Sequence, residues 1–581
     1  MTLTLRHTHR PDAPHQIRWR PWGSGAFEEA ASAGRLVFLN LTASWNEACR
    51  ELDADTLSDD RVGAVLNTSF VPVRVDTDRL PHVQDRYIAG SWPTNAFLTP
   101  TGEVLWSGNG IGAEALLDVA DAVRHAWSQN RESLQLEIER RRRGHEAGRR
   151  ETAGGLVRRD AARDVTAAAR AMYDAQHGGF GPPPKYPPGD AIELLLTMSA
   201  HGDAEAAGMV DQTLDGMRNG LIDIVDGGSF RCAAGGDWSA PSSEKLLDIN
   251  AVQLESYALG ASVRGRDEWA DVAAAMVSWV DATLGLPSGL WGASQRADAF
   301  YFACDATRRG GLEAPAVDTT LFTCWNAQWI AALACAGGRL GRHAWITRAA
   351  SAYVTLSSAM TATNGLFYHY CTTDGDRDVD YLLLDVLEMA RAAMMLFQAT
   401  GSTACLGDAQ RWTHMMEKSF WATDGGFWDC ADSEGTAVLR YRDRAFDMNA
   451  RAARLLLDLH FATGERRYRA LAERTLAVLS PRASRLGVGA AAFALAVEEF
   501  FTTPACVAIV GDAASTQPLR RAALCLPLPG HRVWSLPAGG RLGTVAIPAS
   551  PSTAAYAVRR SGCSAPILDP AALATAFKSP K

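Results

Sequence analysis

The sequence predicts an α+β multidomain protein in which an α/β domain, a larger helical domain and a small α/β segment follow one another. Three observations support this prediction. Short apolar runs typical of buried strands occur before residue 130 and after residue 503. Between them, apolar residues recur at i, i+3, i+4 and i+7, as in amphipathic helices. Turns that join glycine to an aromatic residue separate these helices repeatedly, which indicates an internal repeat.

The chain length and these changes of pattern place the domain boundaries. A chain of 581 residues is long enough for several domains, each with its own hydrophobic core. We expect four parts, which are an α/β domain at residues 1–130, a charged linking helix at 131–164, the helical domain at 165–503 and a C-terminal α/β segment at 504–581. Each part can therefore carry a function of its own.

The first part has the element order of a thioredoxin-like domain. Leu36–Leu41 is an apolar run that predicts a buried strand, and Phe70–Asp76 predicts a second one. Between them, Asn46 precedes a helix that is expected to end near Leu57. An amphipathic stretch at 113–127 predicts the helix that closes the domain.

The redox motif of such a domain is incomplete in this chain. The nucleophilic cysteine would lie at the N-terminus of the helix, where the helix dipole lowers the pKa of its thiol. Asn46 occupies that position, three residues before Cys49, and asparagine caps helices but cannot attack a disulfide. Cys49 is then a buried structural thiol or, as the alternative, the single thiol of a redox or sensor protein, alone or with Cys563. Pro93, after Trp92, fits the position of the cis-proline that packs beside this helix.

A strongly charged stretch follows the first domain. Residues 131–163 include the run Arg140–Arg143. Such a stretch is typical of a solvated linking helix, and an anion-binding site is the alternative.

The helical domain consists of repeated amphipathic segments. Apolar residues at helical spacing predict helices at 190–200, 204–217, 249–261, 269–283, 325–336, 345–360, 382–399, 403–420, 449–463 and 468–479. Turns such as Gly178–Gly181 and Gly425–Trp428 stand between alternate helices. About six helix pairs of this kind close naturally into an (α/α)6 toroid, in which the inner helices surround a cavity.

The C-terminal segment returns to an α/β pattern. Val507–Gly511, Arg532–Leu536 and Ala554–Val558 predict strands, and Ser515–Cys525 predicts a helix. The turn after the first of these strands lacks the glycine pattern of loops that bind dinucleotides or phosphates. We therefore expect no cofactor.

Composition and charge argue against several classes of protein. A net charge of −8 is unlike the basic excess of nucleic-acid-binding proteins, so no nucleic-acid partner is expected. No long apolar run and no signal-peptide core are present, so we expect a cytoplasmic protein without membrane association. The eleven cysteines show neither a Cys-x-x-Cys pair nor zinc-type spacing, which indicates free thiols and no metal. The oligomeric state stays open.

Several short motifs, in a fixed order, match one known family. Trp19–Gly23 corresponds to a Trp-Tyr-Pro-Trp-Gly entry, and Gly178–Gly181 with Pro184–Pro187 to Gly-Gly-Phe…Pro-Lys-Phe-Pro. Trp238–Leu247 corresponds to Trp-x-x-Pro-His-Phe-Glu-Lys-Met-Leu, and Thr323–Asn326 to Thr-Ser-Trp-Asn. In these residues the chain resembles the spermatogenesis-associated protein 20-like family. The resemblance implies a thioredoxin-like domain fused to an (α/α)6 toroid of the N-acylglucosamine 2-epimerase type, a fold also described as six-hairpin glycosidase-like.

The chain departs from the family pattern at polar positions. The residues that replace the Cys-x-x-Cys, a histidine and two aspartates are Asn46–Cys49, Ser242, Ile249 and Thr319. The chain is therefore identified as a divergent member with a degenerate Cys-x-x-Cys motif. Sugar epimerases of this fold use histidine pairs, but no family histidine corresponds to His177, His369 or His414.

Charged residues near the ends of the inner helices are the candidates for acid/base chemistry. Glu244 and Lys245 are either an ion pair that ties a loop or a catalytic acid/base pair. Asp318, Asp385 and Asp447 lie near helix starts. Each is either a helix N-cap or a carboxyl group at the toroid mouth, where one carboxyl could act as acid and another as base. Glu244, Asp318 and Asp447 are the predicted catalytic carboxyl groups.

Aromatic and amide side chains near the same turns are the candidates for substrate binding. Those predicted to contact a substrate are Phe180, Trp238, Asn250, Trp325, Asn326 and Asp385. Core packing is the alternative for the aromatic residues. The sequence thus predicts an enzyme of the isomerase or hydrolase kind, which acts on a small polar or sugar-like molecule in the toroid pocket. A redox-inactive thioredoxin-like domain would cover that pocket, and a non-catalytic scaffold or binding protein is a further alternative.

Overall fold

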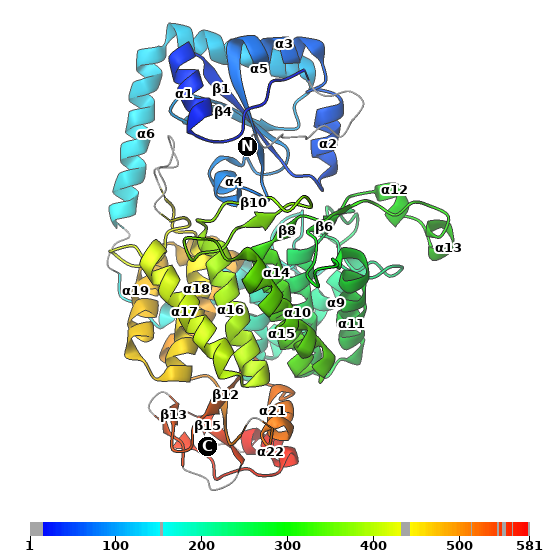
Figure 1. The fold of residues 1–581 in the computed structure, drawn as a ribbon, viewed down its shortest axis with the longest axis vertical. Coiled ribbons are helices and arrows are strands. Elements are labelled where there is room, and N and C mark those ends of the chain that lie inside the picture. The colour runs from blue at the N-terminus through cyan, green and yellow to red at the C-terminus, as the bar shows by residue number, and fades with distance from the viewer. Residues whose placement is uncertain are drawn as a thin grey trace. The chain divides into compact units, whose positions relative to one another are not determined.

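The computed structural model describes residues 16–151, 155–431, 442–512, 514–542, 545–548, 553–559 and 562–578 (Figure 1). The chain folds into two compact units. The first contains Met1–Glu151 with the short segments Arg296–Asp298 and Cys430–Asp443. The second contains Thr152–Gln295, Ala299–Asp429 and Arg444–Lys581. The C-terminal segment therefore belongs to the same unit as the helical domain.

The first unit is built on a four-stranded sheet in the order β2-β1-β3-β4. Its strands are β1 (Leu36–Thr42), β2 (Phe70–Asp76), β3 (Thr94–Leu98) and β4 (Val104–Asn109). β1 runs parallel to β2 and antiparallel to β3. All residues of β1 and β2 are buried, which explains why both strands are mostly apolar and do not alternate between apolar and polar residues.

Helices flank this sheet as expected for a thioredoxin-like domain. They are α1 (Ser24–Ala33), α2 (Glu47–Ala54), α3 (Asp60–Ser69), α4 (Pro81–Tyr87) and α5 (Ala113–Gln129). Asn46 is the N-cap of α2, and its side-chain oxygen accepts a hydrogen bond from the backbone N–H of Cys49 at 3.1 Å. The peptide bond between Trp92 and Pro93 is cis. Both features were predicted from the sequence.

The charged stretch forms the helix α6 (Arg131–Glu151), which ends before the predicted boundary at residue 164. A new helix, α7 (Asp160–Ala171), begins after it. Arg140 pairs with Glu137 one turn earlier in α6, as a solvated helix would arrange its charges. The side chains of residues 141–142 and 144–151 lie outside the described part of the structure.

The second unit is a ring of helix pairs. In the described residues the inner helices are α8 (Gly189–Ala200), α10 (Leu247–Arg264), α14 (Thr323–Arg339), α16 (Leu383–Thr400), α18 (Phe446–Thr463) and α20 (Ala491–Phe501). Each inner helix packs against the next, and the contact of α20 with α8 closes the ring. The outer helices are α7, α9 (Ala204–Gly220), α11 (Asp267–Trp279), α15 (His343–Met360), α17 (Thr403–Phe420) and α19 (Arg466–Ala483).

This arrangement confirms the predicted (α/α)6 toroid and most of its helices. The periodicity found α8–α11 and α14–α19 to within a few residues at each end. It missed α7 and α20, which pack against each other. α20 is apolar on all sides because it lies inside the ring, so it lacks the alternation of faces that marks an amphipathic helix.

The C-terminal segment packs against the ends of the inner helices. Its sheet has the order β12-β11-β15-β16 and is built from β11 (Cys506–Val510), β12 (Arg532–Leu536), β15 (Ala554–Arg559) and β16 (Gly562–Cys563). The helix α21 (Gln517–Leu524) contacts α14 and α16, and Arg520 donates a hydrogen bond to the carbonyl oxygen of Gln398 at 2.9 Å. In Figure 1 this segment lies at one end of the helical ring.

Two expectations about the chain as a whole can be compared with the structure. Within the described residues, no helix combines the length and the apolar character needed to cross a lipid bilayer. All eleven cysteines are free thiols, as their spacing predicted.

Candidate functional site

Three asparagines at the starts of inner helices hold the glycine-aromatic turns. In each case the side-chain oxygen accepts a hydrogen bond from a turn N–H, and the amide nitrogen donates to the carbonyl oxygen of the same residue. The pairs are Asn250 with Ser229, Asn326 with Trp291, and Asn449 with Phe427. Asn250 and Asn326, which were predicted to bind substrate, are fully buried, and their amides are occupied by the protein backbone.

Cations repeat in the same turns. Each bonds a glycine carbonyl oxygen and pairs with an aspartate of the same turn. The sets are Lys185 with Gly178 and Asp174, Lys245 with Gly227 and Asp223, and Arg444 with Gly425 and Asp424. Lys245, predicted to be catalytic, is thus one copy of a repeated arrangement that ties a turn to the following segment.

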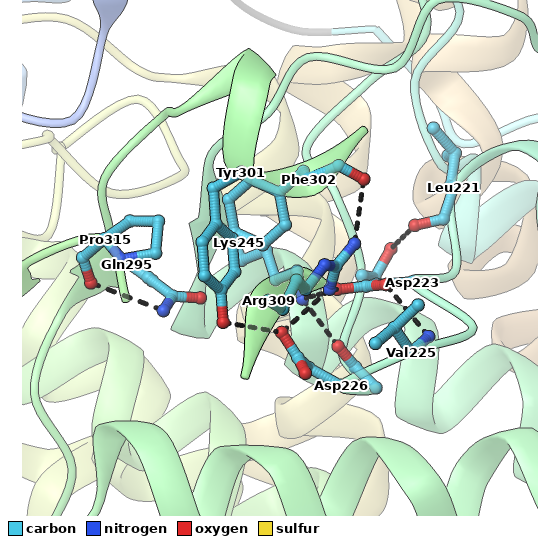
Figure 2. A network of polar contacts seen from close by, with 12 residues as sticks. Leu221, Asp223, Val225, Asp226, Lys245, Gln295, Tyr301, Phe302, Arg309 and Pro315 are labelled. Carbon is cyan, nitrogen blue, oxygen red and sulfur yellow. Dashed lines mark hydrogen bonds and ion pairs between the residues drawn. The ribbon is translucent and has the colours of Figure 1, made fainter. Parts of the chain in front are cut away.

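Lys245 itself is fully buried, and Figure 2 shows the network of polar contacts around it. Its Nζ lies 2.7 Å from Asp223, and Arg309 contacts both Asp223 and Asp226 at 2.7 Å. The Lys245 Nζ also lies 4.8 Å from the ring centroid of Phe302, as expected of a cation–π contact. Burial lowers the pKa of Lys245 to about 8, although the Asp223 carboxylate opposes this change.

The expected ion pair between Glu244 and Lys245 is not formed, and that interpretation is wrong. Glu244 directly precedes Lys245, the first residue of the short strand β5 (Lys245–Leu246). Neighbouring side chains in an extended chain point in opposite directions, so these two reach different partners. Glu244 is 3% exposed and pairs with Arg231 at 2.6 Å, while Lys245 pairs with Asp223.

None of the three candidate aspartates occupies the N-cap position of a helix, so the N-cap interpretation is also wrong. The N-cap positions of α16 and α18 belong to Leu382 and Ala445. Asp447 is the second residue of α18 and is exposed. Asp318 lies in the short strand β7 (Val317–Asp318), where it accepts a hydrogen bond from the N–H of Thr320 at 2.9 Å.

Asp385, the third of these aspartates, is fully buried in the first turn of α16. The His369 Nδ1 atom lies 3.0 and 2.9 Å from its two carboxylate oxygens. The backbone N–H of Cys324, in the first turn of α14, donates to Asp385 at 3.1 Å. His369 had no family counterpart in the sequence, but the structure places it beside a predicted site residue.

The candidate aromatic residues differ in position. Trp238 is 2% exposed and donates a hydrogen bond from Nε1 to the carbonyl oxygen of His177 at 3.0 Å. A Cβ atom at Gly179 would lie 2.6 Å from the Trp238 ring, so this turn requires glycine. Trp325 is half-buried, 4.8 Å from Phe322 between ring centroids. For Trp238, the contacts therefore fit the core-packing alternative rather than substrate binding.

A cavity of about 500 Å³ runs between the inner helices. Of the residues predicted to form the site, Phe180 is the one that lines it within the described part of the chain. Its charged lining residues are Asp190, Glu193, Glu255, Asp458, Arg339, Arg391, Arg451, Arg454 and Arg532. The cavity is therefore polar, unlike the apolar core around it.

A network of ion pairs forms part of the cavity wall. Arg454 of α18 contacts Glu193 at 2.6 Å and Glu499 at 2.9 Å. Arg532 of the C-terminal segment contacts Asp458 at 2.7 Å and Glu499 at 3.1 Å. Burial alone would raise the pKa of Glu193, but the Arg454 guanidinium outweighs it and holds the pKa at about 2. The two arginines and the three carboxylates of this network therefore compensate one another's charge.

Farther along the cavity, two arginines stand near the carboxyl group of Glu255. Arg391 contacts the buried Glu388 at 2.5 Å, and Arg451 lies 3.5 Å from Glu388 and 3.7 Å from Asp190. Glu255 of α10 forms no hydrogen bond and no ion pair with the described residues, although the positive charge of Arg391 acts to lower its pKa. Burial raises the pKa of Glu255 to about 7.

Glu255 was missed by the sequence analysis. A single glutamate in a helix resembles a surface residue until the neighbouring helices are known. The available signal was its setting, because α10 has no clearly polar face on which a charged residue would be expected to be exposed. The same holds for Glu193 and Glu388, which stand within apolar runs of α8 and α16.

The Cys49 site of the first unit is closed. The Cys49 side chain is 1% exposed, and burial raises the pKa of its thiol to about 11. A reactive single thiol needs exposure and a lowered pKa, and Cys49 has neither.

Comparisons with known proteins support the resemblance stated from the motifs. Residues 5–143 match the model of a family described as a protein of unknown function, DUF255, with the name Thioredox_DsbH. Human spermatogenesis-associated protein 20 is 26% identical over 336 residues, which are 52% of this chain and 40% of the human protein. An uncharacterized protein of Caenorhabditis elegans is 27% identical over 278 residues, 44% of this chain and 37% of that protein. The chain thus matches about two fifths of the length of these curated relatives.

Solved structures with a similar arrangement match a little over half of the chain. A D-mannose isomerase has a TM-score of 0.45 and 15% identity, over 54% of this chain and 83% of that one. A cellobiose 2-epimerase from Bacillus thermoamylovorans has a TM-score of 0.45 and 10% identity, over 55% and 85% of the two chains. A family 76 glycoside hydrolase from Bacteroides thetaiotaomicron has a TM-score of 0.44 and 13% identity, over 59% and 78%.

Proposed function

We propose that this protein is an enzyme that acts on a small polar or sugar-like molecule by acid/base chemistry in the cavity of its helical ring. The observation that carries this proposal is Glu255, a cavity-lining carboxyl group without a protein partner among the described residues. Its pKa of about 7 lets it give and take a proton at neutral pH. A concave pocket that contains convergent polar groups and a group with a perturbed pKa is the usual starting hypothesis for a small-molecule site.

Arg391 and Arg451 supply the second part of the proposed chemistry. Guanidinium groups offer several N–H donors in a fixed plane, which suits hydroxyl groups and oxygen atoms that gain negative charge during a reaction. Glu388 is 0% exposed and contacts both arginines, at 2.5 and 3.5 Å. We assign to Glu388 the role of positioning these arginines beside Glu255.

The catalytic groups expected from the sequence take other roles in this proposal. Glu244 and Lys245 are committed to Arg231 and Asp223, and Asp318 and Asp447 are not among the described residues that line the cavity. We therefore propose Glu255 as the acid/base in their place. Lys245 is assigned to holding its turn, and so are Asn250 and Asn326.

We propose that the first unit is redox-inactive. The position of the nucleophile holds Asn46, whose side chain is bonded to the helix start, and the remaining thiol at Cys49 is buried. A single-thiol redox function at Cys49 is the less favoured candidate because its pKa is raised rather than lowered. A role for this unit as a cover of the cavity stays a prediction.

The decisive experiment changes Glu255 to glutamine, which keeps the shape of the side chain and removes its acid/base function. The purified wild-type protein is first assayed with a panel of neutral and acidic monosaccharides and disaccharides. Binding is measured by calorimetry, and reaction by NMR with solvent deuterium uptake. We expect Glu255→Gln to lower turnover about 10²–10⁴-fold while substrate still binds.

The matched control is Glu473→Gln, which makes the same change at an exposed position of the outer helix α19. It should keep wild-type turnover. Turnover retained by Glu255→Gln would contradict the role of this residue. Binding of a sugar without any reaction would instead identify a binding protein, the non-catalytic alternative.

A further inference from the structure

A cysteine, a histidine and an aspartate meet inside the ring, outside the cavity described above. They are Cys324 in the first turn of α14, His369 in the segment before β9 (Tyr370–Cys371) and Asp385 in the first turn of α16. All three are at most 1% exposed. One donor atom from each residue lies within 4.8 Å of the donor atoms of the other two. We propose that these residues form a structural zinc site.

The types of donor atom favour zinc over other common metal ions. Zn²⁺ binds the sulfur of cysteine, the nitrogen of histidine and the oxygen of aspartate, whereas Ca²⁺ and Mg²⁺ prefer oxygen atoms alone. Structural zinc sites commonly have four protein ligands, so with these three a buried water molecule would have to complete the tetrahedron. Full burial makes the Cys324 thiol inaccessible to a substrate, so a structural role suits this group better than a nucleophilic one.

The spacing of the donor atoms is close to that of a zinc site. Adjacent ligands of a tetrahedral zinc ion stand roughly 3.3–3.6 Å apart, given zinc–ligand distances of about 2.0–2.3 Å. The His369 Nδ1 atom lies 2.9 and 3.0 Å from the Asp385 oxygens, and the widest separation in the group is within 4.8 Å. The three groups would have to shift by about an ångström to close on one ion.

The charge of the surroundings favours a cation at this place. Asp385 and Asp248 direct negative charge at the Cys324 thiol, and so does Glu388, whose own charge is paired with Arg391 and Arg451. A buried charge is costly unless an opposite charge compensates it. A thiolate, a carboxylate and a neutral imidazole together carry two negative charges, which one Zn²⁺ ion neutralises.

The position of the site in the fold gives such an ion a structural use. α14 and α16 are neighbouring inner helices, and His369 belongs to the connection that pairs β8 (Leu321–Phe322) with β9. One zinc ion would therefore join two repeats of the ring at the starts of their inner helices. The ligands are 45 and 16 residues apart in the chain, so the short spacing of familiar zinc motifs could not reveal them.

The test uses the full-length protein and measures metal rather than turnover, so its result does not depend on whether Glu255 is catalytic. Zinc is measured by mass spectrometry after removal of any affinity tag, and zinc affinity by competition with a chromophoric chelator. Co²⁺ is then loaded in place of zinc. We expect one zinc ion per chain, a thiolate-to-cobalt absorption band, and a lower melting temperature after chelation.

Cys324→Ser should lose the thiolate-to-cobalt band and weaken zinc binding by more than the roughly 10–100-fold that loss of an outer-shell partner causes. The family motif carries serine at this position, so the variant is expected to fold. Cys405→Ser, at a half-buried cysteine of the outer helix α17, is the matched control and should keep the band. Asp385→Asn provides a second variant.

Three results would overturn the zinc site. They are a wild-type protein that neither carries zinc nor takes it up, a cobalt spectrum without a thiolate band, and a band that persists in Cys324→Ser. The first two need only the wild-type protein, so misfolding of a variant cannot hide the answer.

Discussion

The pocket around Lys245 and the cavity wall at Glu255 belong to the same ring, and both contain a buried titratable group. They differ in whether that group has partners. Lys245 contacts Asp223, the Gly227 carbonyl oxygen and three aromatic rings, and it has counterparts in other turns. Glu255 faces the cavity without a hydrogen bond among the described residues. A buried titratable group whose hydrogen bonds and ion pairs are all made within the protein maintains the fold. A buried group without such partners is available to bind a ligand.

The largest expected effect comes from removing the charge of Lys245. Lys245→Met leaves Asp223 and Asp226 with Arg309 as their remaining cation, and loss of one partner from a buried ion pair costs about 3–5 kcal/mol. Urea denaturation should show this loss in the free energy of unfolding. Turnover per folded molecule should fall far less than in Glu255→Gln.

Lys185→Met is the matched variant, because Lys185 makes the corresponding contacts in the first turn. It should be destabilised to a similar degree. The contrast between the two regions would fail if Lys245→Met kept full stability and lost turnover, since that outcome would identify Lys245 as the catalytic group expected from its motif.

These two residues also show how far sequence reasoning reaches. The turn that contains Lys245 is visible in the sequence because several repeats carry the same glycine-aromatic pattern, and the ring follows from that pattern and from the helical periodicity. The ion pair of Lys245 was not predictable, because Asp223 stands 22 residues earlier in the chain, and Arg309 bonds the same carboxylate from a more distant segment. The role of Glu255 was hidden for a stronger reason. It depends on arginines from two other helices, and on the lack of a partner among the described residues, which only three-dimensional packing determines.

The second prediction concerns the pH dependence of stability that the Glu255 carboxyl imposes. Its pKa is about 7 in the folded protein and 4.5 in the reference state. The folded protein therefore holds this proton more tightly, so the contribution is fully present below about pH 4.5 and is lost as the pH rises through about 7. The expected loss is on the order of 1–3 kcal/mol, given 1.36 kcal/mol per pKa unit and partial solvation in the cavity.

Glu255→Gln should remove this part of the pH dependence, and it should make the protein more stable than wild type at pH 8. Urea denaturation of both proteins at pH 5, 6, 7 and 8 gives the measurement. Parallel curves for wild type and variant would show that Glu255 has an ordinary pKa, and the difference from the Lys245 pocket would disappear.

The smallest expected effect is at Cys49. Burial raises the pKa of its thiol as it raises the pKa of the Glu255 carboxyl, but the effect on reactivity is the opposite. Burial raises both pKa values, to about 11 for Cys49 and to about 7 for Glu255. The raised value brings a carboxyl into the range of acid/base catalysis, whereas it takes a thiol out of the range in which the reactive thiolate is populated. At pH 8, three units below its pKa, Cys49 carries a thiolate in about one molecule per thousand.

Alkylation of the native protein with iodoacetamide at pH 8, followed by peptide mass mapping, should leave Cys49 unmodified until the protein is unfolded. Cys525 is exposed and serves as the internal control that reacts first. Cys49→Ser should leave turnover unchanged, because the proposed chemistry lies entirely in the ring. Rapid modification of native Cys49 would restore the single-thiol function as a candidate, since a thiol can react quickly only if it is exposed and readily deprotonated. The contrast between an unreactive Cys49 in the first unit and an available Glu255 carboxyl in the second would then be lost.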